Sequence, residues 1–186
     1  MRRPGFWLWL SCSAGIFACS SDTAPTVYVG MAYQVRCIDC QPRALDDAER
    51  DVKAVDADAG FKLTCAASTQ SGAKRVSFSI MHESATEEQR YTLAVSHAKL
   101  DGEETDGPCS VRVVEGANTY EGPCGSDDPS EERPCKVSFE VKGGVLNGSL
   151  YCAKLPSDAS SSIQRYVVAP LSRDPAKFEI HGCQGI

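Results

Sequence analysis

The sequence predicts an all-β protein, a disulfide-stabilised antiparallel β-sandwich, with a small β-barrel as the alternative. Short segments rich in β-branched and aromatic residues follow one another at even spacing, without long helical periodicity. Two pairs of these segments flank tight turns that contain glycine. The same region holds an even set of cysteines, which favours a framework of disulfides. These cysteines are Cys37, Cys40, Cys65, Cys109, Cys124, Cys135, Cys152 and Cys183.

The first 19 residues have the order of a secretory signal peptide. Two arginines precede an apolar run that ends in the small residue Ala18, and Cys19 follows it. The run is shorter than the roughly 20 apolar residues that a membrane-spanning helix needs. We therefore expect a cleaved signal peptide, a short polar tether and a single domain, over residues 1–18, 19–27 and 28–186.

Residues 16–19, Ile-Phe-Ala-Cys, resemble the lipobox of bacterial lipoproteins, although Phe17 stands where that motif usually has a smaller residue. The resemblance implies that cleavage exposes Cys19, whose thiol and amino group then carry lipid such as palmitate. Cys12 is a rival acylation site, but cleavage there would leave a very short apolar run. Cys19 is followed by Ser20 rather than aspartate, which by the same resemblance implies sorting to the outer membrane of a Gram-negative cell.

Cleavage of the signal peptide makes the chain more acidic. The full sequence has 19 basic and 25 acidic side chains, and cleavage removes two arginines and no acid, so the net charge changes from -6 to -8. An acidic domain argues against nucleic acid and anionic lipid headgroups as partners. Export also favours disulfides among the remaining cysteines.

The strands of the domain are expected to begin near residue 27. Residues 27–37 have the composition of one strand, and residues 42–55 fit either a helix face or the first arm of a hairpin. We favour the hairpin, because Gly60 directly precedes the period-two alternation of residues 61–65. Further strands are expected over residues 76–80, 91–98, 109–115, 118–122, 135–142, 145–152, 165–169 and 177–183.

The two glycines at 143–144 fix the register of one hairpin, because such a pair favours a two-residue turn. Counting outward from this turn places Cys135 opposite Cys152, in a pair whose side chains approach closely. The alternate apolar residues from 137 to 141 then share one face, which we expect to form core while the other face meets solvent.

A second hairpin turns at residues 116–117 and places Cys109 opposite Cys124, here in a hydrogen-bonded pair. If both hairpins run up and down, all four cysteines meet at one end of the sandwich. A bridge from Cys124 to Cys135 therefore competes with the two hairpin bridges. Bridges within the hairpins would leave Cys65 to pair with Cys183 and Cys37 with Cys40, which is one of 105 possible connectivities.

Two residues separate Cys37 from Cys40, as in the cysteine pair of thioredoxin-like oxidoreductases. Those enzymes place the pair at a helix N-terminus within a βαβ unit, which lowers the pKa of the thiol. No βαβ pattern surrounds this pair, and Asp39 between the cysteines would raise the thiol pKa. We favour a small structural disulfide and keep a periplasmic thiol–disulfide oxidoreductase as the rival hypothesis.

Acidic residues gather at 56–58, 101–106 and 127–132, and calcium binds to oxygen ligands of this kind. None of these groups has EF-hand spacing, and solvated surface turns explain them better. A calcium-dependent adhesion module remains a third hypothesis. The scattered histidines and widely spaced cysteines lack paired zinc ligands, so we assign no metal site and no cofactor.

Other reactive residue types fit ordinary strand positions. The sequence contains neither G-x-S-x-G nor H-E-x-x-H, and we assign no catalytic residue. His97 continues the alternation of residues 91–95 and is expected to be a partly buried strand residue. Gly148 lies in a formal glycosylation sequon, but it is better explained by the room it leaves for Phe139.

The lipobox and the cysteine-bridged strands together resemble cysteine-rich secreted lipoproteins of myxobacteria-like Gram-negative organisms. This resemblance spans most of the chain and implies no particular activity. We expect a lipid-anchored cell-envelope protein, at the outer membrane, that acts as a non-enzymatic binding or structural module. Its expected partners are the membrane, through the lipid on Cys19, and a protein or glycan.

Overall fold

The computed structural model describes eight parts of the chain, namely residues 28–31, 34–36, 61–82, 91–100, 107–125, 128–158, 164–169 and 172–186. These residues form eleven strands and no helix: β1 (Tyr28–Met31), β2 (Gln34–Arg36), β3 (Phe61–Gln70), β4 (Ala73–His82), β5 (Tyr91–Lys99), β6 (Ser110–Glu115), β7 (Asn118–Gly125), β8 (Cys135–Lys142), β9 (Val145–Pro156), β10 (Gln164–Val168) and β11 (Ala176–His181). Within the same residues, no helix offers the length and hydropathy that a bilayer crossing requires. The predicted all-β class is confirmed.

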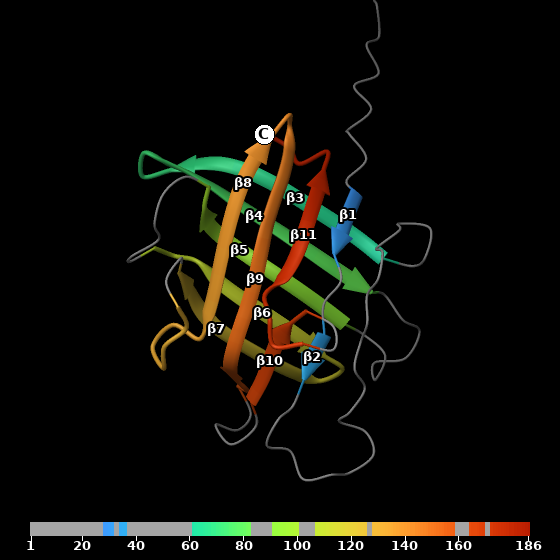
Figure 1. Cartoon of the computed structure of the whole chain (residues 1–186), viewed down its shortest axis with the longest axis vertical. Helices are drawn as coiled ribbons and strands as arrows, with labels where there is room; N and C mark the ends of the chain where they lie inside the picture. Colours follow the sequence, from blue (N-terminus) through green and yellow to red (C-terminus); the bar gives the residue numbers. More distant parts are fainter. Residues whose placement is uncertain are drawn as a thin grey trace, which may run out of the picture.

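One path of hydrogen-bonded strands runs through most of the domain, in the order β1-β11-β9-β8-β7-β6-β5-β4-β3. β10 pairs with β9 and with β2 beside this path. Figure 1 shows that β8, β9 and β11 cross in front of β3 to β6, so the sheet folds over itself into two layers. The result is nearly closed and combines the two predicted architectures, sandwich and small barrel.

The hairpin of β8 and β9 has the predicted register. Gly143 and Gly144 have φ values of 61° and 79°, as a two-residue hairpin turn requires. Cys135 then lies opposite Cys152, and the alternate residues Val137 and Leu150 are buried. The sequence prediction for this hairpin is confirmed at the level of individual residue pairs.

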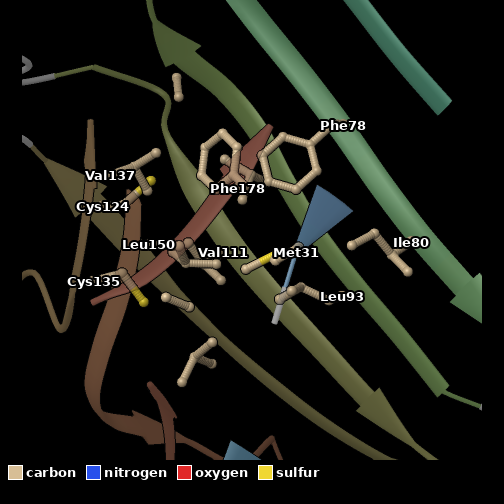
Figure 2. Packing of buried hydrophobic residues seen from close by; sticks show 14 of the residues in the cluster. Met31, Phe78, Ile80, Leu93, Val111, Cys124, Cys135, Val137, Leu150 and Phe178 are labelled. Atoms are coloured by element: carbon tan, nitrogen blue, oxygen red, sulfur yellow. The ribbon is translucent and has the colours of Figure 1, made fainter. Parts of the chain in front are cut away.

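Inward-facing side chains of both layers form the core, and three phenylalanines connect the layers. The Phe78 ring of β4 lies 5.1 Å from that of Phe178 on β11 and 6.5 Å from that of Phe139 on β8, measured between centroids. Figure 2 shows Phe78 and Phe178 side by side above Val111, Leu150 and their neighbours. Contacts of this kind hold the two layers together.

Gly148 gives room to a different ring from the one predicted. A Cβ atom at this position would collide with the carbonyl oxygen of Ser138 and with the ring of Phe178. Phe178 is the cross-strand partner of Gly148 on β11, whereas Phe139 is its partner on β8. The prediction named Phe139 because the sequence revealed only the β8 neighbour of this central strand.

The strand predicted over residues 27–37 is two strands with different partners. β1 pairs with β11, whereas β2 pairs with β10. Both partners lie along the same long strand, because β11 pairs with residues 146–150 of β9 and β10 with residues 152–156. A chain that follows this side of the sheet must therefore change partner midway, which divides the predicted strand.

The tip of the β8–β9 hairpin also departs from the prediction. Val141 was expected to face the core, yet 43% of it is exposed. The hairpin tip extends beyond the opposite layer in Figure 1, and the buried face ends within this residue pair, because Leu146 opposite Val141 is fully buried whereas Val141 is not. β8 pairs with β7 only at Cys135 and Lys136, and within the described residues no strand pairs with the rest of that edge.

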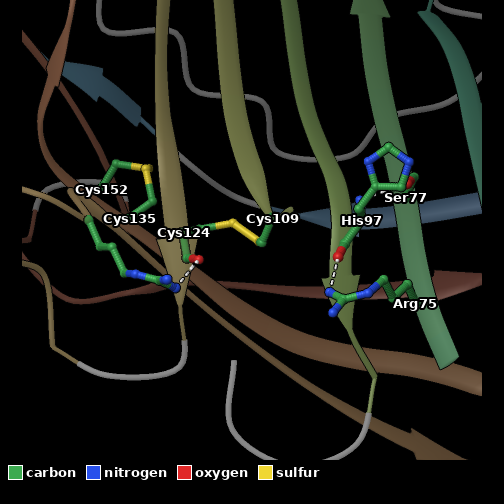
Figure 3. Close-up of a disulfide and its surroundings, with 8 residues drawn as sticks. Arg75, Ser77, His97, Cys109, Cys124, Cys135 and Cys152 are labelled. Carbon is green, nitrogen blue, oxygen red and sulfur yellow. Dashed lines mark hydrogen bonds between the residues drawn. A yellow bond between two sulfur atoms is a disulfide. The ribbon is translucent and has the colours of Figure 1, made fainter. Parts of the chain in front are cut away.

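His97 is partly buried, as predicted, but it interrupts the alternation of β5 instead of continuing it. Its φ is 55°, and the register of β5 against β4 shifts between Val76 and Phe78, as in a β-bulge. Arg75 Nη1 donates to the His97 carbonyl at 2.8 Å, and the His97 amide donates to Ser77 Oγ at 2.9 Å (Figure 3). The extra residue explains why Ala98, rather than His97, faces the core.

Three disulfides occur among the described residues, and all six sulfur-bearing residues are buried. Two of them stand next to each other where β7 meets β8 (Figure 3). Cys109 is bonded to Cys124 and Cys135 to Cys152, while Cys124 and Cys135 are neighbours in the parallel β7–β8 pair. The predicted convergence of these four cysteines is confirmed, and the bridges follow the hairpins.

The third disulfide, Cys65–Cys183, closes the other side of the sheet. The residues after it form a parallel bridge, Ala66 to Gln184. The Ala67 amide donates to the Gln184 carbonyl at 2.7 Å, and the Gln184 amide donates to the Cys65 carbonyl at 3.1 Å. One covalent bond and two hydrogen bonds therefore connect β3 to the segment that follows β11.

We expect loss of the Cys65–Cys183 bridge to destabilise the domain more than loss of Cys109–Cys124. The first closes 118 residues and the second 15. Chain entropy alone then gives about 4 to 5 kcal/mol for the first and about 3 kcal/mol for the second. Free energies of unfolding in denaturant, measured for the two double alanine variants, test the ranking, and equal losses would contradict it.

Candidate functional site

A groove of about 590 Å³ lies between β7 and β9, beside the loop that leads into β8 at the lower left of Figure 1. Its walls come from β7, the loop before β8, β9 and the first residue of β10. The lining residues are Gly122, Pro123, Pro129, Ser130, Glu131, Glu132, Pro134, Ala153, Lys154, Pro156 and Gln164. Four of them are prolines, whose rings keep their shape and carry no amide hydrogen.

The groove exists because β7 and β9 diverge between two fixed ends. At one end Tyr120 bridges to Ser157, and the Asp158 amide donates to the Thr119 carbonyl at 3.0 Å. At the other end β7 pairs with β8 rather than with β9. Pro123 and Pro156 lie on the two diverging strands, and neither can donate to a hydrogen-bond ladder.

The loop wall of the groove is held in place along its length. Lys136 Nζ donates to Asp128 Oδ1 at 2.8 Å near the start of the described loop. The Ser130 amide donates to the Arg133 carbonyl at 2.9 Å, and the Arg133 amide donates back to Ser130 Oγ at 3.1 Å. These contacts fix the turn that presents the intervening glutamates.

The end of the loop is attached to both neighbouring strands. Arg133 Nη1 donates to the Cys124 carbonyl at 3.4 Å, and the Ala153 amide donates to the Pro134 carbonyl at 2.7 Å. Two buried disulfides flank this point. The wall is therefore formed before any partner arrives, which lowers the entropic cost of binding.

Gly122 forms the floor of the groove, where the loop packs onto β7. A Cβ atom at this position would lie 2.5 Å from Pro134 Cγ and 3.0 Å from Leu155 Cδ1. Both distances are shorter than ordinary van der Waals contact. Only glycine lets the Pro134 ring approach β7 this closely.

Lys154 lies at the lip of the groove because of a β-bulge in β9. Cys152 pairs with Val167 and Leu155 with Arg165, so two residues of β9 oppose one residue of β10. Lys154 is one of these two residues. Its backbone φ is 59°, a value that residues other than glycine rarely adopt. The bulge leaves Lys154 exposed while Leu155 returns to the core.

The groove carries charges of both signs. Glu131 and Glu132 are exposed on the loop wall, opposite in charge to Lys154. Within the described part of the chain, none of these three side chains takes part in an ion pair. Their charges are therefore available to a partner.

Arg165 is a buried charged residue on β10, next to Gln164 of the groove lining. Its side chain contacts other residues of the domain. Arg165 Nε donates to Glu115 Oε2 at 2.9 Å, and its guanidinium lies 4.8 Å from the centroid of the Tyr120 ring. Ion pairing and the cation–π contact compensate for burial of the charge. Sequence reasoning missed this contact, for which the only signal is an arginine within an apolar strand.

Several predicted sites lie outside the described residues. These are Cys19, the Cys37–Cys40 pair, the segment 42–55 and the acidic groups at 56–58 and 101–106. Among the residues that are described, no three His, Cys, Asp or Glu side chains gather as metal ligands would. Of the third acidic group, Asp128 pairs with Lys136 and the glutamates line the groove.

The described lining of the groove is poor in nucleophilic side chains. As far as the chain is described, it contains one hydroxyl group, that of Ser130, and no histidine or cysteine. That hydroxyl accepts a hydrogen bond from the Arg133 amide within its own turn. Sequence reasoning did not find the groove, although prolines in two otherwise regular strands were a signal of interrupted pairing.

Comparison with known proteins finds no family model, no curated protein and no solved structure that matches this chain.

We expect Gly122→Ala to destabilise the domain by about 1 to 3 kcal/mol, the usual cost of overpacking. The added methyl group must displace Pro134, and with it the loop wall of the groove. Urea unfolding of the wild type and the variant measures the loss. Pro134→Ala, combined with Gly122→Ala, should recover part of it, and no recovery would show that Pro134 is not the obstacle.

The Asp128–Lys136 ion pair should be visible in a pH titration. The hydrogen bond from Lys136 and its positive charge hold the pKa of Asp128 below the usual value of an aspartate. The pair therefore stabilises the loop at pH values above that usual pKa, and the effect is lost as pH falls through the lowered one.

NMR titration of the Asp128 carboxyl tests this. In Lys136→Met the pKa of Asp128 should rise towards its usual value, whereas Lys142→Met on the same strand should leave it unchanged. An unchanged Asp128 titration in Lys136→Met would rule out the ion pair in solution.

Proposed function

We propose that this protein is a lipid-anchored cell-envelope lipoprotein that acts as a non-enzymatic binding module. The observation that carries the proposal is the preformed groove between β7 and β9, whose described lining presents the charged side chains of Glu131, Glu132 and Lys154. A rigid site of this kind binds a partner at a low cost in conformational entropy.

Two independent features support the proposed location in the cell envelope. Disulfides form and persist in proteins that fold outside the cytoplasm, and three occur among the described residues. The lipobox-like residues 16–19 and Ser20 favour a lipid on Cys19 and sorting to the outer membrane. Attachment would leave the folded domain free to present its groove at a membrane surface.

We expect Cys19→Ser to abolish lipid attachment and to release the domain from the membrane fraction. Cells of a Gram-negative host would be labelled with a clickable palmitate analogue, and the label on the protein compared in membrane and soluble fractions. Cys12→Ser is the matched control and should keep both label and membrane attachment. Labelled, membrane-bound Cys19→Ser protein would refute the anchor.

A further inference from the structure

We propose that the groove between β7 and β9 binds an extended peptide segment through an arginine or lysine side chain of that segment. This inference rests on the proposed binding function and names the chemistry of the partner. Three properties of the groove carry it: its fixed shape, its excess of hydrogen-bond acceptors and the sign of the charge on its loop wall.

The size and shape of the groove suit a short stretch of extended chain. Its volume of about 590 Å³ falls within the range of about 300–1,000 Å³ that is typical of ligand sites. Gly122, Ala153 and four prolines contribute small, stiff surfaces that lose little rotamer freedom on binding. The lining offers no aromatic ring among its described residues, so neither a sugar nor a nucleobase finds a face to stack on.

The hydrogen-bonding groups of the groove favour a partner that donates. Proline contributes a carbonyl and no amide hydrogen, and an ionised glutamate only accepts. Pro123 and Pro156 flank the opening, and Glu131 and Glu132 stand on the loop wall. An arginine side chain supplies several donors and can bind a carboxylate through two parallel hydrogen bonds.

The positions of the charges determine which wall of the groove a cationic side chain would contact. Glu131 and Glu132 lie on the loop, whereas Lys154 lies on the β9 side. A cationic side chain is attracted to the loop wall and repelled from the opposite lip. The loop needs no rearrangement to receive it, because the Asp128–Lys136 and Ser130–Arg133 contacts already fix its course.

Fluorescence anisotropy with a defined probe tests the proposal on the whole mature lipidated protein in detergent. The probe is a fluorescein-labelled peptide, Ala-Pro-Arg-Ala-Pro-Ala, and its matched partner has glutamate in place of arginine. The arginine peptide should bind at least about fivefold more tightly than the glutamate peptide, and rising salt should reduce the difference.

Charge-neutralising variants locate the site. Glu131→Gln and Glu132→Gln should each weaken binding of the arginine peptide by about two- to fivefold, as expected of exposed ion pairs. Lys154→Gln should strengthen it by a similar factor. Glu140→Gln removes the same charge from an exposed position on β8 that does not line the groove, and should have no effect.

Several outcomes would overturn the inference. They are equal binding of the two peptides, no binding of either at millimolar concentration, and equal losses in Glu131→Gln and Glu140→Gln. Preferential binding of an uncharged chitooligosaccharide at the groove would assign the site to a glycan instead. None of these outcomes alters palmitate labelling of Cys19, so failure of this inference and failure of the proposed membrane anchor are distinguishable.

Discussion

Closure of the sheet by the Cys65–Cys183 bond is the constraint on which the rest of the domain depends. On the opposite side, the described strands of the two layers are joined by the two parallel residue pairs Cys124–Cys135 and Gly125–Lys136 and by the single bridge from Tyr120 to Ser157. The bond and the Ala66–Gln184 bridge prevent the layers from separating at the other side. The phenylalanines that connect the layers can then pack, because β4 and β11 are held at a fixed separation. A covalent bond is effective here because it joins residues far apart in the chain, where the unfolded state has most entropy to lose.

The groove is a consequence of how the chain passes from one layer to the other. β7 must leave the strands of the first layer and meet β8 at the start of the second, so it cannot stay paired with β9 along its whole length. The space between them is kept open by prolines and covered on one side by the loop before β8. The disulfides at Cys124 and Cys135 hold both ends of that loop. Stability and the proposed recognition site therefore share the same few residues.

The sequence predicted features of the fold that depend on neighbouring residues better than features that depend on contacts between distant strands. The register around residues 143–144 followed from a turn and a period of two, and both act over a few neighbouring residues. The divided strand at residues 28–36, the bulge at His97 and the ring above Gly148 depend on strands that are distant in the sequence. The groove depends on four separate strands and loops at once. No spacing in the sequence contains that information, although its prolines mark where pairing stops.

The exposed edge of β8 affects how closely neighbouring copies of the domain can approach one another. An unpaired strand edge invites the edge of a second molecule, and proteins guard against this with charged side chains. Lys136, Glu140 and Lys142 alternate along the outer face of β8, beside an edge that has no described partner beyond Lys136. A tether to a surface, as we propose, raises the local concentration of copies far above that in solution. The charges on this strand would then act as spacers that keep neighbouring domains apart, so that each groove stays open to a partner.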